Sequence, residues 1–236
     1  MIGRKVLTGF ICVILFFLFI VMMITSVSDI KLSVSSETVK TLPDLIVDAG
    51  HGGEDGGAVS DNGVLEKDTN LLIANDTADL LYLFGFDVTK TRSDDTALST
   101  NGDTVRSRKV DDMKKRLEIF NSSDNNVVIS IHQNKFTESE YYGTQIFYSP
   151  NNEKSKILAE NIKFSVKSLL QPENERECKK ADSGIYLLNN TDKPAVIVEC
   201  GFISNNEELQ KLLTDSYQKQ MSYSIVTGFL DYYNTN

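Results

Sequence analysis

Residues 45–58 read Leu-Ile-Val-Asp-Ala-Gly-His-Gly-Gly-Glu-Asp-Gly-Gly-Ala. The opening residues, Leu45 to Val47, have the length and β-branching of a buried strand. They lead into a glycine-rich loop that contains His51. Because glycine adopts backbone angles closed to other residues and lets other atoms approach closely, the loop predicts a histidine held above a strand end. The glycine spacing does not match a P-loop, and no Gly-Lys-Ser/Thr follows, which excludes that type of phosphate site.

The chain has only one other histidine, His132, and it too closes an apolar run, which starts at Val127. Both histidines therefore stand at or just past the carboxyl end of a predicted buried strand. In open α/β sheets this edge is where ligands bind. The alternative is a pair of histidines that only bond to nearby backbone.

The composition is that of a globular protein with a substantial core, since 41% of the residues are hydrophobic and 24% are charged. A net charge of −9 excludes a broad attraction to nucleic acid. One basic cluster falls on a predicted helix, and we expect it to be a solvated face; the alternative is contact with an anionic substrate. Its members are Arg106, Arg108, Lys109, Lys114, Lys115 and Arg116.

Residues 1–28 form a separate unit. Arg4 and Lys5 precede an uncharged, mostly apolar run from Val6 to Ser28. A secretory signal has about 7–15 apolar residues, whereas a spanning helix needs about 20. We therefore expect an uncleaved signal anchor with its amino end inside, the alternative being a cleaved signal peptide. Residues 29–43 are expected to be a linker, and residues 44–236 a single domain outside the cytoplasm, anchored to the membrane or secreted.

From Leu45 onward, predicted strands and helices alternate. The strands fall at 45–47, 86–91, 127–132, 144–148, 185–188 and 195–198. The helices fall at 68–84, in a segment ending at 121, at 154–170 and at the C-terminus. This pattern predicts a three-layer α/β sandwich, with a central, mostly parallel mixed sheet of about six strands and helices on both faces.

Two glutamates are candidates to join the histidines. Glu66 lies at the far end of the glycine loop, where it can fold back beside His51 or simply favour a helix start. Glu199 ends an apolar run that begins at Pro194. If the Glu199 side chain faces a site, burial would raise the pKa of its carboxyl group to a value suited to a general base. The alternative is a glutamate that faces solvent. Two histidines and one glutamate would leave a fourth position open, as in catalytic zinc sites, so these residue types are the parts of a zinc hydrolase.

Four blocks of sequence carry a family resemblance. The first is residues 45–58, and the others read Leu65-Glu-Lys-Asp-Thr-Asn-Leu71, Ser130-Ile-His-Gln-Asn134 and Pro194-Ala-Val-Ile-Val-Glu-Cys-Gly-Phe-Ile-Ser-Asn205. In order and spacing they resemble the zinc-dependent N-acetylmuramoyl-L-alanine amidases of the type 3 family, over essentially all of residues 45–233. The resemblance implies that residues 44–236 are a zinc amidase catalytic domain.

The resemblance also implies roles for the candidate residues. It implies a Zn²⁺ ion held by His51, Glu66 and His132, with Glu199 as the catalytic acid/base. The implied substrate is the amide that joins the lactyl group of muramic acid to the first L-alanine of the peptidoglycan stem peptide.

Asp48 and Asn134 are expected to orient the ligands. Gln133 stands where family members more often have alanine, which we interpret as neutral. With an anchor and a catalytic domain alone, the chain is most similar to the membrane-anchored spore-cortex and germination type, which strips stem peptides so that muramic lactam can form. We expect membrane attachment, no nucleic-acid partner, and a partner protein that places or activates the domain on the cell-wall side.

Two other functions fit the same residues. A zinc peptidase that cuts within the stem peptide would use the same ligands, and a pseudoenzyme would only bind wall peptides. The glutamate at position 199 argues against the pseudoenzyme, because a protein that only binds wall peptides would not need an acid there.

Cys178 and Cys200 could pair in an oxidising compartment, but we expect free thiols, because buried cysteine is common as a small hydrophobe.

Overall fold

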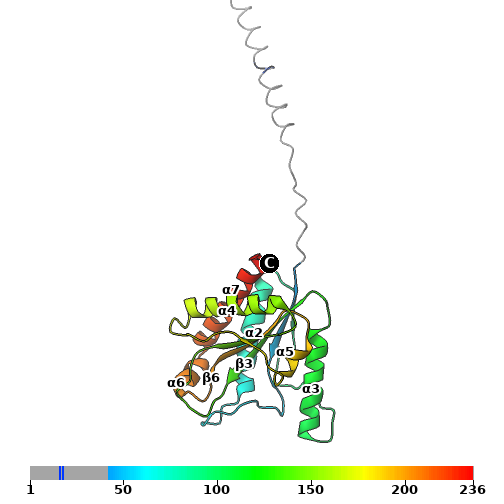
Figure 1. Ribbon diagram of the computed structural model, residues 1–236, viewed down its shortest axis with the longest axis vertical. Helices are drawn as coiled ribbons and strands as arrows, with labels where there is room; N and C mark the ends of the chain where they lie inside the picture. The colour runs from blue at the N-terminus through cyan, green and yellow to red at the C-terminus, as the bar shows by residue number, and fades with distance from the viewer. Residues whose placement is uncertain (1–15, 17, 19–41, 236) are drawn as a thin grey trace, which may run out of the picture. The chain divides into compact units, whose positions relative to one another are not determined.

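The computed structural model describes residues 16, 18 and 42–235 (Figure 1). The chain divides into two compact units, residues 1–41 and 42–236. Apart from a few positions, the predicted signal anchor at 1–28 and linker at 29–43 lie outside the described residues. None of the helices in the described part is both long and apolar enough to cross a membrane.

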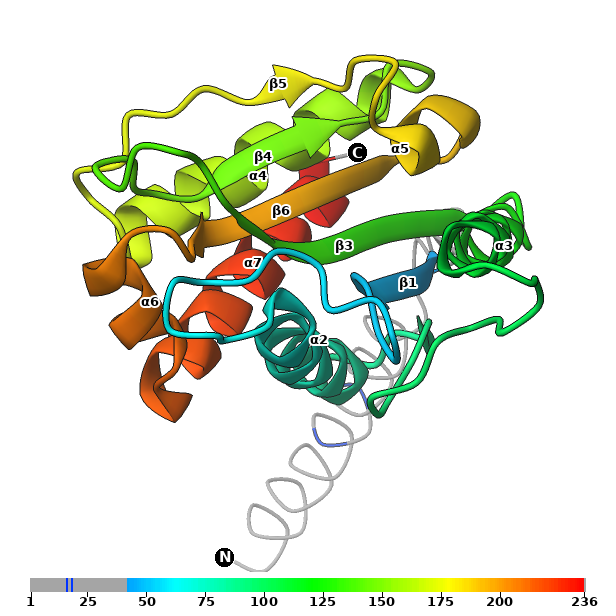
Figure 2. The ribbon, with the colours of Figure 1, turned by 90° about the horizontal axis from the view of Figure 1, so that it is seen from below.

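Six strands form one sheet in the order β2-β1-β3-β6-β4-β5. Figure 2 shows β1, β3, β6 and β4 side by side. The first four strands of that order are parallel to one another, whereas β4 is antiparallel to β6 and parallel to β5. The strands are β1 (Asp44–Ala49), β2 (Val88–Lys90), β3 (Asn126–Asn134), β4 (Gln145–Tyr148), β5 (Lys179–Lys180) and β6 (Ala195–Phe202).

Helices cover both faces of this sheet, which confirms the predicted three-layer α/β sandwich. One face packs against α2 (Glu66–Leu83), α4 (Glu153–Leu169) and α7 (Asp215–Thr235). The other face packs against α3 (Val105–Phe120) and the short α5 (Tyr186–Asn190). A further helix, α6 (Asn206–Leu212), follows β6.

Successive residues of β1 enter two different cores. Leu45 and Val47 pack in the core under α2, α4 and α7, whereas Ile46 packs with Phe120 of α3 and Leu188 of α5. Strands β3 and β6 alternate in the same way. Because successive side chains of a strand point to opposite faces, this alternation buries the sheet on both sides, as continuous apolar runs predict.

The polar residues at the carboxyl ends of these strands continue the face that α3 and α5 cover. Asp48 follows Ile46 by two residues and pairs with Ser130 of β3. Two residues further along β3, His132 pairs with Glu199 of β6. Strand alternation and register therefore bring these polar side chains to one face of the sheet, at one edge.

The predicted strand at 185–188 is wrong, because residues 186–190 form α5. Leu187 and Leu188 are both buried in the same core. Neighbouring residues point to opposite faces of a strand, but both can reach one core from a helix, and a short apolar run does not distinguish these cases. The sheet gains its remaining strand from β5, which the sequence did not predict because its two residues are exposed lysines and form no apolar run. The sequence did not predict α6 either; the other predicted elements overlap the observed ones.

Cys178 and Cys200 are free thiols, as expected.

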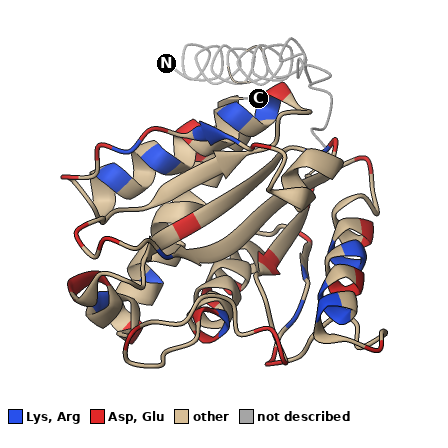
Figure 3. Ribbon diagram, turned by 60° about the horizontal axis from the view of Figure 1, so that its bottom comes forward, with Lys and Arg blue, Asp and Glu red and all other residues tan. Residues whose placement is uncertain are grey.

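The basic cluster on α3 is only partly a solvated face. Figure 3 shows acidic and basic residues together on this helix. Arg116, however, is only 3% exposed. Its guanidinium donates hydrogen bonds to the carboxylates of Asp48 and Asp112 and to the backbone carbonyls of Ala49 and His51. The prediction of a solvated face is wrong for Arg116, which ties α3 to the end of β1.

Asp48 completes this buried ion pair. It is inaccessible to solvent and accepts further hydrogen bonds from Thr91 and Ser130, at 2.7 and 2.5 Å. Burial acts to raise the pKa of Asp48, but the Arg116 charge, the nearby His132 and these hydrogen bonds hold the pKa below its usual value. The carboxylate is therefore charged in the folded protein.

We predict that Arg116→Met lowers the free energy of unfolding by about 3–5 kcal/mol, because the Asp48 carboxylate stays buried without its cation. Urea unfolding at neutral pH measures this loss. Lys114→Met removes an exposed charge from the same helix and should change the free energy of unfolding by less than about 0.5 kcal/mol. A loss below about 1 kcal/mol in Arg116→Met would show that the ion pair is not a main support.

The same ion pair should make stability depend on pH. Because the folded-state pKa of Asp48 is lowered, its contribution is present above the ordinary carboxyl pKa of about 3.9 and is lost as the pH falls through the folded-state pKa. Below about pH 5, the free energy of unfolding should therefore fall more steeply in wild type than in Asp48→Asn. Equal slopes in acid-to-neutral urea titrations would mean that Asp48 is not stabilised as an anion.

Candidate active site

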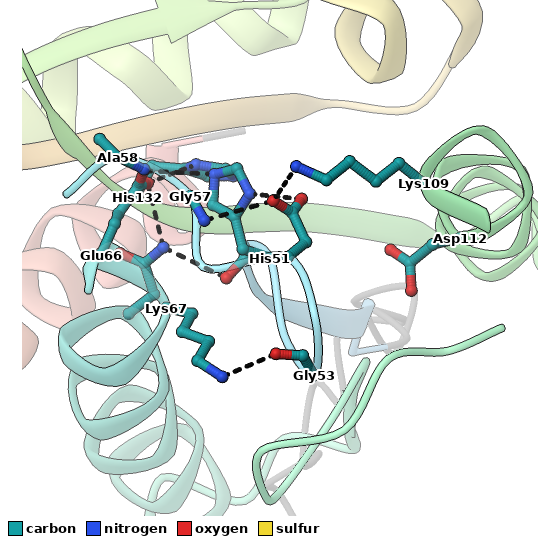
Figure 4. A network of polar contacts seen from close by, with 12 residues as sticks. His51, Gly53, Gly57, Ala58, Glu66, Lys67, Lys109, Asp112 and His132 are labelled. Carbon is teal, nitrogen blue, oxygen red and sulfur yellow. Dashed lines mark hydrogen bonds and ion pairs between the residues drawn. The ribbon is translucent and has the colours of Figure 1, made fainter. Parts of the chain in front are cut away.

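His51, Glu66 and His132 converge at the carboxyl edge of the sheet (Figure 4). His51 follows β1, Glu66 begins α2, and His132 lies in β3. Each offers one ligand atom within 4.8 Å of the others. Glu66 lies between the two rings, with Oε2 3.3 Å from His51 Nε2 and Oε1 3.0 Å from His132 Nδ1. The three residues form a group that could hold a metal ion.

Two glycines of the loop make this convergence possible. A Cβ atom at Gly50 would overlap the His132 ring. Gly57 has a φ of +69°, and a Cβ there would lie 2.6 Å from Glu66 Oε2 and 2.7 Å from His51 Cδ2. His51 itself has a φ of +63°, which is uncommon for a residue other than glycine and is held here by the surrounding contacts.

Glu66 is held as a buried carboxylate. Its side chain is 4% exposed. Oε2 accepts the Ala58 amide at 2.8 Å, and Oε1 accepts the Gln133 amide at 3.0 Å and the Asn70 side-chain amide at 3.1 Å. Burial acts to raise the pKa of Glu66, but hydrogen bonds and charges from His132 and His51 hold the pKa far below its usual value. The group is thus a fixed negative charge.

His51 lies between two carboxylates. Its Nδ1 is 2.8 Å from Asp55 Oδ2, while its Nε2 faces Glu66. Burial acts to lower the pKa of His51, but Asp55 and Glu66 raise it to about 9. The same negative surroundings that favour a proton here favour any other cation, including a metal ion.

Glu199 adds an acid of a different kind. It pairs with His132 across β3 and β6, and its Oε2 is inaccessible and has no hydrogen-bond partner among the described residues. Burial raises the pKa of Glu199 to about 7; His132 and His51 act to lower it, and Glu66 acts to raise it. A carboxyl group that titrates near neutral pH suits proton transfer in both directions.

The glycine loop is fastened by polar residues that the sequence did not predict. Arg92 is buried and donates to the carbonyls of Ala49, Gly50 and Lys67. Asn70 also donates to the Gly50 carbonyl. Arg92 follows β2 at the same sheet edge as the histidines, so its place in the chain was a usable signal. For Asn70, inside α2, the usable signal was its place in the family block 65–71.

The two residues expected to orient the ligands lie in different surroundings. Asp48 bonds to Arg116, which also donates to the His51 carbonyl, so Asp48 is linked to the loop through that arginine. The Asn134 carbonyl accepts the Ile203 amide. Its side chain has no hydrogen bond among residues 42–235, and its orienting role stays a prediction. The Gln133 side chain donates to Asn70, whereas its bond to Glu66 comes from the backbone N–H, which alanine would also supply. A neutral effect of Gln133 stays a prediction.

The donor set fits a catalytic metal ion. Two imidazoles and one carboxylate are the ligands of one class of hydrolytic zinc site, in which a fourth position stays open for water or substrate. The Glu66 carboxylate is charged and buried, and the nearby glycines leave space. Glu199 pairs with His132 across the strands, and its Oε2 has no hydrogen-bond partner within residues 42–235. The arrangement combines a group that could hold a metal ion with an adjacent carboxyl group, and metal-assisted hydrolysis requires a cation and a group that transfers a proton.

The sequence is similar to those of known amidases. The family model described as N-acetylmuramoyl-L-alanine amidase matches residues 45–231. The germination-specific N-acetylmuramoyl-L-alanine amidase of Bacillus subtilis is 36% identical over 190 residues, which cover 80% of this chain and 79% of that protein.

Solved structures give the same result. The CwlD amidase from Clostridioides difficile, solved in complex with the GerS lipoprotein, is 37% identical with a TM-score of 0.78 and covers 82% of this chain and 100% of that one. An N-acetylmuramoyl-L-alanine amidase from Clostridium difficile 630 is 29% identical with a TM-score of 0.72, and covers 83% of this chain and 98% of that one. The chain therefore belongs to the type 3 family of N-acetylmuramoyl-L-alanine amidases.

Proposed function

We propose that this amidase is a zinc hydrolase that cleaves the amide between the lactyl group of muramic acid and the L-alanine of the stem peptide. The observation that carries this proposal is the convergence of His51, Glu66 and His132 beside Glu199, whose Oε2 is inaccessible and has no hydrogen-bond partner among the described residues. Those three side chains would hold Zn²⁺. When bound, the ion supplies Lewis acidity and lowers the pKa of a bound water.

Glu199 moves the proton in this proposal. Its carboxylate takes a proton from the attacking water and later delivers it to the nitrogen of the departing alanine. A pKa raised to about 7 supports both steps, because near neutral pH the carboxyl group is present in both its charged and its protonated form. Glu66 cannot take this role, since its pKa is held far below the usual value and its oxygens accept hydrogen bonds from Ala58, Gln133 and Asn70.

The cellular setting is part of the proposal. The apolar run at 6–28 supports a domain displayed outside the cytoplasm on a membrane anchor. Similarity to a germination-specific amidase supports action on the spore cortex, where removal of stem peptides precedes muramic lactam formation. The CwlD amidase was solved with a lipoprotein, which supports a partner protein for this chain as well.

Product analysis tests the bond that is cut. Incubation of the purified protein with Zn²⁺ and defined muropeptides should release stem peptides with a free N-terminal alanine and leave glycan without peptide, as measured by liquid chromatography and mass spectrometry. Fragments cut within the stem peptide would instead identify a zinc peptidase. Binding without any product would identify a protein that only recognises wall peptides.

We predict that Glu199→Gln lowers kcat by about 10²–10⁴-fold while the protein retains its zinc, because the amide cannot accept a proton but keeps the shape of the side chain. Release of stem peptide measures kcat, and elemental analysis measures zinc per chain. Glu153→Gln provides the control, since Glu153 is exposed at the start of α4 and should keep wild-type kcat. Turnover above about one tenth of wild type in Glu199→Gln would mean that another group carries the proton.

A further inference from the structure

Helix α3 reaches the glycine loop through two neighbouring ion pairs. Lys109 Nζ lies 2.6 Å from Asp55 Oδ1, and Arg108 Nη2 lies 2.8 Å from Glu54 Oε2. Figure 4 shows Lys109 extending from α3 toward the ring of His51. The loop is therefore held from the α3 side at residues 54 and 55, in addition to the Arg116 contact with the His51 carbonyl.

Asp55 divides its two oxygens between the helix and the histidine. Oδ2 faces His51 Nδ1 at 2.8 Å. Oδ1 accepts Lys109 and, at 3.3 Å, the Gly57 amide. With one oxygen held by α3 and by the loop backbone, the other oxygen has a defined direction toward the imidazole.

This contact determines which nitrogen of His51 is available. A carboxylate beside Nδ1 holds a proton on that nitrogen, so a bound cation would displace the proton on Nε2 and use the Nε2 lone pair. Nε2 is the atom that faces Glu66 Oε2. The geometry thus directs the basic nitrogen of His51 to the side where the other two candidate ligands lie.

We propose that Asp55 and Lys109 are positioning residues for the metal site: Asp55 orients His51, and Lys109 of α3 fixes Asp55. The inference rests on the proposed metal site and adds two residues that neither touch substrate nor bind the metal. It assigns α3 a function beyond packing, because the ligand geometry then depends on where this helix sits. The competing explanation is that the Lys109 pair, with side chains 45% and 26% exposed, only ties two surface segments together.

Zinc affinity distinguishes these explanations without any turnover. Metal-free full-length protein is titrated with Zn²⁺ against a chromogenic chelator. The dissociation constant should rise about 10–100-fold in Asp55→Asn, the range typical of lost partners behind a metal-binding histidine. It should rise about three- to fivefold in Lys109→Met, because a half-exposed ion pair contributes modestly. Lys109→Arg keeps the charge and should restore affinity to within about twofold of wild type.

Lys115→Met is the matched control. Lys115 Nζ forms an ion pair with Glu118 of the same helix at 2.7 Å, and its side chain is 44% exposed, close to the 45% of Lys109. This ion pair joins two residues of α3 rather than α3 and the loop. Its variant should bind Zn²⁺ with wild-type affinity. Circular dichroism melting of the metal-free variants separates loss of orientation from loss of folding. A shifted visible absorption band at saturating Co²⁺ in Asp55→Asn, with an unchanged melting temperature, would support the orienting role.

The outcomes separate the two claims. Wild-type zinc affinity in Asp55→Asn contradicts this inference, and equal effects of Lys109→Met and Lys115→Met contradict the part assigned to α3. A wild-type protein that binds no Zn²⁺ at all contradicts the proposed function itself.

Discussion

The buried carboxylate of Glu66 is the constraint on which the rest of the site depends. A buried negative charge destabilises a protein unless hydrogen-bond donors and cations surround it. Three N–H groups and two imidazoles supply them, and its position as the first residue of α2 adds the positive end of a helix dipole. These requirements determine the neighbouring chain: the loop must return beside the helix start, Gly57 must leave room, and β3 must present His132.

The site is also tied to elements outside its own sheet edge. Arg92 and Asn70 hold the glycine loop from the side of β2 and α2, whereas Arg116 and Lys109 hold it from α3. The loop therefore keeps an uncommon backbone conformation at His51 because side chains bond it from two directions. The position of the candidate ligands thus depends on polar contacts with residues that are not ligands themselves.

Much of the fold and the candidate ligand set could be predicted from the chain. Buried parallel strands have apolar sequences, and ligands bind at the carboxyl edge of such strands, so the sequence alone predicts that His51 and His132 share one site. Arg116 and Asp55 could not be predicted in the same way, because the partner of each charge depends on where α3 packs against the loop. The helix at 186–190 was missed because adjacent apolar residues fit a buried strand and a short helix equally well.

The central claim is that two histidines and one buried glutamate form a single zinc site beside Glu199. Anomalous diffraction from crystals grown with Zn²⁺, recorded on both sides of the zinc absorption edge, tests it most directly. The account predicts one zinc peak about 2.0–2.2 Å from a nitrogen of His51, an oxygen of Glu66 and a nitrogen of His132. A peak bound by other residues, or none at saturating Zn²⁺, would contradict it.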